Sequence, residues 1–395
     1  LSSMFSGCLN LKSLKVGNAP NVTNASSMFS RCASLASIAF TGGGVSTATN
    51  LSSIFYYCHK LSVLQNFRTN SATNLSNAFY ACYILLKISI NTDNVTTLQS
   101  AFRSCVSVRK IVLTSVANLT TIREAFSSCY QLESLRIRNL NSSNLSGSAL
   151  YSSFANCLKL RRLPSFSDTS ACTSYYNCCA NMQNLEKFPD WDLSGMTDGR
   201  GFLSCTNYPN VRLTQIPDIT VTGITNNNNF GFTNLYALSG VGNIDCRNAT
   251  RNHNFYGVNN VQQWGTMNLS SMSSSYYFFY GSSSTTMPKI IFSSGCSVGT
   301  WNLYSVREVP DIDLSGVTIG NTFVSMHHLD SFKGYNITEN ITFNGSAIPS
   351  GTINHIQVSG LASGVTNRTL TLTNVSRASE VDFTVALSKG WTVTT

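Results

Sequence analysis

Residues 24–40 have the sequence NASSMFSRCASLASIAF, in which Phe29 and Cys32 form the pattern Phe-x-x-Cys. The pattern recurs along the chain, and its successive copies begin 24, 26, 24, 23, 24, 28 and 48 residues apart. The eight copies are Phe5/Cys8, Phe29/Cys32, Phe55/Cys58, Phe79/Cys82, Phe102/Cys105, Phe126/Cys129, Phe154/Cys157 and Phe202/Cys205. The longest interval has room for a degenerate copy, which we place at Tyr175 and Cys178. A repeat of this length predicts a solenoid, because each unit can bury its apolar face only against its neighbours.

Each unit combines a polar turn with two apolar patterns. Asn24 can cap a short helix that carries Met28 and Cys32 on one face. The following segment, residues 35–40 (LASIAF), ends in alternating apolar and polar residues, which predicts a short strand. We therefore predict an α/β repeat solenoid of the leucine-rich-repeat type, with a short helix and a parallel strand in each unit of about 24 residues.

The repeat changes along the chain and defines three predicted segments. Residues 1–205 hold the regular repeats, residues 206–337 continue the solenoid as degenerate repeats, and residues 338–395 form a β-rich C-terminal cap. A separate domain from about residue 206 is the alternative. The degenerate units are marked by Phe232, Phe255, Phe279, Trp301 and Phe323.

The sequence also leads to one prediction for each end of the chain. Leu1 already lies inside a repeat unit, so we expect at least one repeat or another domain to be missing upstream. In the cap, the apolar residues around Ile353, Val358 and Phe383 predict strands only.

The repeat resembles the BspA-type class of leucine-rich repeats, including its mycoplasma surface-lipoprotein branch. The resemblance is carried by residues 1–14, 24–38, 51–64 and 75–88, and it fades to spacing alone after about residue 210. Proteins of this class occur as bacterial surface adhesins, in some protist surface proteins and in bacteriophage tail fibres. The resemblance therefore implies binding outside the cell rather than catalysis.

Composition narrows the function classes. Only 11% of the residues are charged, against roughly 25% in an average soluble protein. No apolar stretch is long enough to span a membrane, which argues against membrane insertion. The basic residues do not form a nucleic-acid-binding pattern, and the chain has no cofactor fingerprint and no recognisable catalytic arrangement. We expect a non-enzymatic protein without cofactor or metal.

The 13 cysteines are predicted to act mainly as buried, small apolar side chains. Equivalent cysteines in adjacent coils would point in parallel, which suits disulfide geometry poorly. The cluster of Cys172, Cys178, Cys179 and Cys205 lacks the paired spacing of a structural zinc site. So many thiols fit folding in a reducing cytoplasm, which favours a virion protein over a secreted adhesin.

Basic residues occupy the outward positions of the predicted strand segments. They are Lys12, Lys15, Lys87, Arg109, Lys110, Arg136, Arg138, Arg161 and Arg162. Stacked coils would gather these side chains on one sheet face, where Arg forks can hold carboxylate, sulfate or phosphate groups. We expect this face to bind an anionic polysaccharide or an acidic surface protein.

Three functions fit these features. The first is a bacteriophage tail-fibre or receptor-binding subunit that contacts host-surface glycan or protein. The second is a bacterial or protist cell-surface adhesin. The third is a structural filament or spacer, in which the chain would form a homo-oligomer without a foreign ligand. All three place the protein outside the cell, on a virion or a cell surface.

Overall fold

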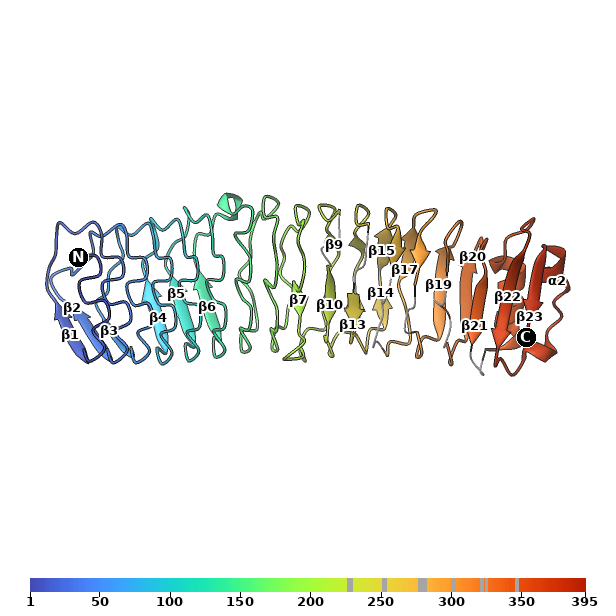
Figure 1. Cartoon of the computed structure of the whole chain (residues 1–395), viewed down its shortest axis with the longest axis horizontal. Helices are drawn as coiled ribbons and strands as arrows, with labels where there is room; N and C mark the ends of the chain where they lie inside the picture. The colour runs from blue at the N-terminus through green and yellow to red at the C-terminus, as the bar shows by residue number, and fades with distance from the viewer. Residues whose placement is uncertain are drawn as a thin grey trace. The chain divides into compact units, whose positions relative to one another are not determined.

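The computed structural model describes residues 1–225, 230–250, 254–275, 283–299, 303–319, 323, 326–344 and 348–395. The chain forms two compact units, Leu1–Asn210 (unit 1) and Val211–Thr395 (unit 2), each of which is a stack of coils (Figure 1). The division falls close to the end of the regular repeats, and the predicted C-terminal cap lies within unit 2.

Unit 1 is built from coils whose short strands pair in parallel. Strand β1 pairs with β2 and β2 with β3, and the same order holds for β4, β5 and β6 (Figure 1). The strands are β1 (Ser13–Val16), β2 (Ser37–Phe40), β3 (Val63–Gln65), β4 (Lys87–Ile90), β5 (Lys110–Leu113), β6 (Ser134–Ile137) and β7 (Leu203–Ser204). The predicted parallel solenoid with leucine-rich repeats is thus confirmed.

The predicted helix of each unit is wrong. In the described residues of unit 1, the one helical element is the 3-10 turn η1 (Ser142–Asn144), which lies outside the Phe-x-x-Cys segments. These segments form successive turns instead, and in residues 24–40 Ser27 and Arg31 adopt left-handed backbone conformations with φ of 53° and 58°. Two left-handed residues per coil interrupt any continuous α-helix.

Hydrogen bonding explains why the turns prevail over a helix. The N–H of Phe29 donates to the carbonyl of Ile54 in the next coil at 2.9 Å, whereas a helix would direct it back along its own segment. The side-chain carbonyl of Asn24 accepts from the N–H of Ser26 at 2.9 Å, so the predicted cap closes a turn. Inter-coil bonds thus satisfy the backbone groups that a helix would have satisfied internally.

The core of unit 1 contains, beside buried aliphatic side chains, one column of rings and one of thiols. Rings of neighbouring coils stack with centroids 5.4 Å apart at Phe5 and Phe29 and 5.7 Å apart at Phe102 and Phe126. The phenylalanines and cysteines of the predicted columns from residue 29 to residue 157 are buried, whereas Phe5 is half-buried and Cys8 is exposed. Coil stacking therefore supplies the burial, as expected for a repeat protein.

The degenerate unit has a different register from the predicted one. In the regular coils, the N–H of the Phe in Phe-x-x-Cys donates to the carbonyl of the residue directly before the corresponding Phe of the next coil. The N–H of Phe154 donates to the carbonyl of Cys178 at 2.9 Å, so the residue after Cys178 corresponds to that Phe. Cys179 therefore holds the Phe site and Met182 the Cys site, and the assignment to Tyr175 and Cys178 is wrong. All four residues are buried, so the apolar pattern of the sequence fits both registers equally well.

The same one-residue offset applies to the last copy of the pattern. The N–H of Cys179 donates to the carbonyl of Phe202 at 2.9 Å, so Leu203 is the residue in line with Cys179. Phe202 and Cys205 are both buried, one residue before the two columns. In each regular coil after the first, the Phe position and the position directly before it both face the core. A Phe can therefore move by one residue, as Phe202 does, and stay buried.

Unit 2 also pairs its strands in parallel, and their lengths range from two to six residues. Its first strands are β8 (Gln215–Ile216), β9 (Ile219–Thr220), β10 (Gly231–Thr233), β11 (Gly240–Val241), β12 (Ile244–Asp245), β13 (Asn254–Tyr256), β14 (Gln263–Trp264), β15 (Thr266–Leu269) and β16 (Ser274–Ser275). The later ones are β17 (Lys289–Phe292), β18 (Ser297–Val298), β19 (Glu308–Asp313), β20 (Ser331–Tyr335), β21 (Ile341–Asn344), β22 (Arg368–Thr373) and β23 (Trp391–Thr394). Two of the predicted unit markers, Phe279 and Trp301, lie outside the described residues.

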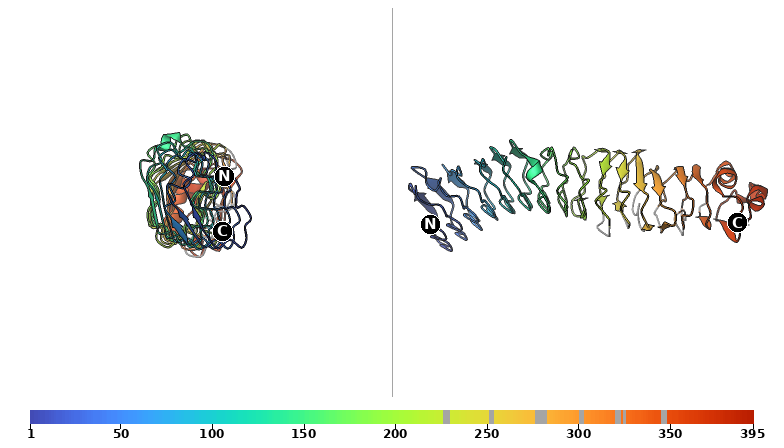
Figure 2. Two further views of the ribbon diagram at one scale, coloured as in Figure 1. Left: turned by 90° about the vertical axis from the view of Figure 1, so that its left-hand side faces the viewer. Right: turned by 90° about the horizontal axis from the view of Figure 1, so that it is seen from above.

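Helices occur at the C-terminal end of unit 2, where only strands were predicted (Figure 2). They are α1 (Ser350–His355), the π-helical turn η2 (Ile356–Gly360), the 3-10 turn η3 (Ala378–Glu380) and α2 (Thr384–Ser388). Short apolar runs fit a buried helix turn as well as a strand, so periodicity over so few residues did not distinguish them. The strand predictions around Ile353, Val358 and Phe383 are therefore wrong.

Candidate binding surface

The register of the strands in unit 1 places one pair of basic residues side by side and a further basic residue on the next strand. Lys87 lies opposite Lys110 in the ladder between β4 and β5, and Val112 lies opposite Arg136 in the ladder between β5 and β6. Strands in a sheet are about 4.8 Å apart, so these side chains are close neighbours. Alternate residues such as Ile111 are buried, which directs the basic side chains outward.

Six of the nine predicted residues lie on successive coils of unit 1, and we call them together the basic strand face. These six are Lys87, Arg109, Lys110, Arg136, Arg138 and Arg162; Lys110 is half-buried and the others are exposed. Beyond β6 residues 160–166 form no strand, and the N–H of Glu186 donates to the carbonyl of Arg161 between the next two coils.

The structure does not bring Lys12 and Lys15 into this face. The coils that carry β2 and β3 lie between them and Lys87, and their outward residues are small or uncharged, as at Ser37 and Gln65. An open depression of about 380 Å³ covers this neutral stretch, with Lys15 on its lining. The predicted single stripe is therefore two separate basic regions.

Acidic residues modify the face: the exposed Glu133 is in line with Arg109 on the next coil, and two ion pairs lie at one end. The Arg161 guanidinium lies 3.3 Å from a carboxylate oxygen of Glu186, and Lys187 lies 2.8 Å from a carboxylate oxygen of Asp190. In the described part of the chain, no comparable ion pair involves the six residues of the basic strand face. Glu186 follows Arg161 by one coil length, and that spacing is the signal that could have revealed the pair.

The face has an open depression near its C-terminal end. It measures about 500 Å³ and is lined by Arg136, Arg138, Leu140, Pro164 and Ser165, together with two strand residues. Two guanidinium groups beside an apolar floor can orient a ring that carries a carboxylate or sulfate group.

The net positive charge of the chain comes from unit 1. Residues 1–210 contain 17 Lys and Arg against 8 Asp and Glu, whereas residues 211–395 contain 9 of each, so unit 1 carries the whole net charge of +9. An uneven distribution of this kind attracts anionic partners to one part of the molecule.

The thiol column offers no reactive centre. Each sulfur donates to a phenylalanine carbonyl of the preceding coil, as Cys58 does to Phe29 at 3.0 Å and Cys105 to Phe79 at 3.1 Å. Burial raises the pKa of both thiols to about 12. Protonated thiols are poor nucleophiles and poor metal ligands.

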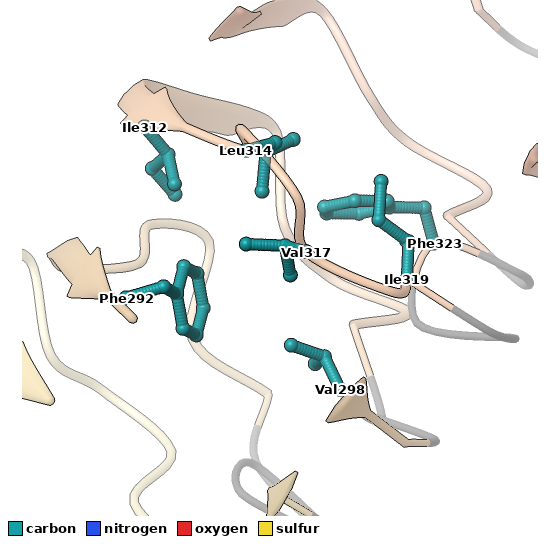
Figure 3. Close-up of a pocket in the computed structure, with 7 residues that line it drawn as sticks. All are labelled: Phe292, Val298, Ile312, Leu314, Val317, Ile319 and Phe323. Carbon is teal, nitrogen blue, oxygen red and sulfur yellow. The ribbon is translucent and has the colours of Figure 1, made fainter. Parts of the chain in front are cut away.

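Other features of the described residues offer no alternative site. A small cavity of about 10 Å³ in unit 2 is lined only by apolar side chains, including Phe292, Val317 and Phe323 (Figure 3). It can hold at most one water and has no polar side chain to retain it. Within the described ranges, no three His, Cys, Asp or Glu residues are grouped to hold a metal ion. No helix there has the length and apolar character to cross a membrane.

Comparison with known proteins identifies the repeats. Residues 46–161 match the model of the BspA-type leucine-rich-repeat region in six copies, and residues 1–84 match a family described as a mycoplasma protein of unknown function. The predicted resemblance is thus confirmed for the N-terminal part of the chain.

A crystal structure of a leucine-rich cell surface protein from Faecalibacterium prausnitzii A2-165 also aligns with the chain. The alignment covers 85% of this chain and 73% of that protein, with 14% identity and a TM-score of 0.33, which is too low to support any conclusion. No curated protein matches the chain.

Proposed function

We propose that this chain, in which residues 46–161 are BspA-type leucine-rich repeats, is an extracellular recognition module that binds an anionic polysaccharide through its basic strand face. The observation that carries the proposal is the presence of Lys and Arg, most of them exposed, on successive coils of unit 1, with Lys87 and Lys110 in register. Such surfaces of solenoids are extended and suit long polymeric ligands. The proposed role is binding without catalysis.

The chemistry of the face favours carboxylated or sulfated sugars. Arg136 and Arg138 line the open depression beside Pro164, so a charged group and the apolar face of a sugar ring can be contacted together. Exposed cations gain little from single contacts, so affinity requires several of them along a polymer.

Within this class, we favour a tail-fibre or other receptor-binding subunit of a bacteriophage over an adhesin exported by a cell. The supporting observation is the column of buried, protonated thiols, which fits folding in a reducing compartment. A cell-surface adhesin is the second candidate and is supported by the match to BspA-type leucine-rich repeats. An antibody against the chain that labels virions rather than cell envelopes would support the first candidate.

The test is binding of the purified, fluorescently tagged chain to candidate host cells before and after enzymatic removal of surface polysaccharide. In solution, heparin serves as an anionic probe and dextran as a neutral one. We expect binding to untreated cells and to heparin, and at least tenfold weaker heparin binding after the double substitution Arg136→Ser and Arg138→Ser.

The matched control is the double substitution Lys289→Ser and Lys333→Ser. Both lysines are exposed strand residues of the neutral unit 2, so this variant removes the same charge elsewhere. Equal losses in the two variants would reduce the proposal to a net-charge effect and contradict it. Binding to neither cells nor heparin would favour the structural filament, and sedimentation would then show self-assembly.

A further inference from the structure

A second surface of unit 1 consists of aromatic and aliphatic side chains on two adjacent coils. We call it the apolar turn patch and define it as Tyr56, Tyr57, Tyr80, Tyr83, Ile84 and Leu86. The N–H of Tyr57 donates to the carbonyl of Tyr80 at 2.8 Å, which fixes the two coils side by side. The patch follows the turns that carry the Phe-x-x-Cys pattern and ends where β4 begins.

The rings of the patch hold one another in place. Tyr57 stacks on Tyr80 with centroids 5.4 Å apart, and Tyr56 contacts both of them at 4.5 and 5.1 Å. His59 lies parallel to Tyr83 at 4.6 Å. Rings that already contact each other lose little conformational freedom on binding, which is the property that makes tyrosine effective in protein-binding surfaces.

Aliphatic side chains extend the patch beyond the rings. Tyr83, Ile84 and Leu86 are 38%, 45% and 59% exposed, and Val63 on the neighbouring coil is 43% exposed. Three exposed large apolar residues within four positions are costly in water unless a partner covers them. A ligand rich in hydroxyl groups gains little from Ile84 and Leu86, whereas an apolar side chain gains much.

The surroundings of the patch are basic. Arg31, Lys60 and Lys87 are exposed around it, and residues 1–132 contain ten Lys and Arg against two acidic residues, Asp93 and Glu124. Glu124 is already engaged in an ion pair with Arg103. A partner that covers the patch thus meets a rim of positive charge.

We propose that the apolar turn patch binds a protein segment that presents aromatic or aliphatic side chains between Asp and Glu residues. In protein–protein interfaces, apolar residues at the centre of a polar or charged rim contribute most of the binding energy. A second copy of the same basic unit would bring like charges together, which argues against self-association here. The patch adjoins the basic strand face at Leu86 and Lys87, but its apolar residues are not part of that face, and the proposal does not depend on the proposed function.

The test selects ligands for the whole purified chain from a displayed library of random 12-residue peptides. We expect enriched peptides to combine aromatic or aliphatic residues with flanking Asp or Glu. A synthetic copy of the most enriched peptide should bind at least tenfold more weakly after the double substitution Tyr83→Ser and Leu86→Ser, as measured by fluorescence anisotropy.

Two variants serve as controls. Tyr130→Ser removes a tyrosine of the same 38% exposure, which directly follows Cys129 as Tyr83 follows Cys82, and should change the peptide affinity less than twofold. The double substitution Arg136→Ser and Arg138→Ser should leave peptide binding unchanged, because it alters only the basic strand face. Circular dichroism checks that every variant is folded.

Several outcomes would overturn the proposal. These are the absence of enriched peptides, peptides insensitive to Tyr83→Ser and Leu86→Ser, and peptides that lack acidic residues. Patch-dependent binding to neutral glycans instead of peptides would assign the surface to sugars. A concentration-dependent dimer that Leu86→Ser abolishes would assign it to a second copy of the chain.

Discussion

Burial between the stacked coils keeps the thiols of the core cysteines protonated. Cys58 and Cys105 are buried, and their sulfur atoms donate to main-chain carbonyls of the preceding coil. Burial raises the pKa of both thiols from 9.0 to about 12. Because the unfolded chain loses these protons first, rising pH favours unfolding.

We predict that the free energy of unfolding decreases between pH 9 and pH 12 and that the variant Cys58→Ala with Cys105→Ala shows a shallower decrease. The stability from each thiol is fully present below pH 9.0 and is lost toward the folded pKa of about 12. Each thiol contributes a slope of about 1.4 kcal/mol per pH unit within that window. Urea titrations at several pH values measure the slope, and Cys8→Ala, at an exposed thiol, should leave it unchanged.

The pairing of Arg161 leads to a second prediction at single residues. Arg161 is engaged by Glu186 at 3.3 Å, whereas Arg162 has no ion pair in the described part of the chain. Heparin affinity should therefore fall more in Arg162→Ser than in Arg161→Ser. Glu186→Gln should raise the affinity about twofold, a small effect because exposed ion pairs are weak. Equal affinities of the two arginine variants would show that the ion pair is irrelevant.

The turn segment replaces the helix as the defining element of the unit. It depends on residues in the left-handed region, such as Ser104 with φ of 59°. A side chain without a β-branch tolerates this conformation at moderate cost, whereas a β-branched one clashes with its own backbone. The N–H of Ser104 donates to the carbonyl of Ser127 in the next coil at 2.8 Å, and Gly7 takes the equivalent position in the first coil.

We predict that Ser104→Val lowers the free energy of unfolding by about 2 kcal/mol relative to Ser104→Gly, because valine resists the left-handed region. Thermal and urea unfolding measure the difference. The control is Ser89→Val, at an exposed strand position of β4 where β-branched residues are favoured, and it should change stability by less than about 0.5 kcal/mol. A Ser104→Val protein as stable as Ser104→Gly would contradict the role given to the turn.

Sequence predicts the elements of this protein unevenly. The spacing of Phe and Cys predicted the coils, and the alternation in residues 35–40 predicted β2, because one face of each must be buried. The helix was mistaken because Met28 and Cys32 fit a helical face equally well when their backbone bonds run to another coil. The register at Cys179 and the ion pair of Arg161 depend on coil length, which varies by several residues and is not fixed by any local signal.

At the scale of the whole molecule, the two units differ in net charge. Unit 1 contains 17 basic and 8 acidic residues, and unit 2 contains 9 of each. Both proposed surfaces lie on unit 1, so approach of an anionic partner is directed there before any contact forms.

We predict that the association rate constant with heparin falls about tenfold between roughly 0.1 and 1 M NaCl, because the screening length shrinks from about 10 to 3 Å. Stopped-flow fluorescence measures this rate. The dissociation rate constant should change less, since contacts at van der Waals distance are screened less than long-range attraction. An association rate constant that is independent of salt would exclude electrostatic steering.

The hydrogen bonds that replace the helix also determine how unit 1 responds to mechanical force. They run between coils, as from Phe29 to Ile54 and from Tyr57 to Tyr80, so tension along the stack loads the coils in series. The core cysteines from residue 32 to residue 157 form no covalent links between coils, and each coil can peel away separately. Release of one coil of about 24 residues lengthens the chain by roughly 80 Å at full extension. Under tension, unit 1 would therefore lengthen in steps of one coil rather than unfold all at once.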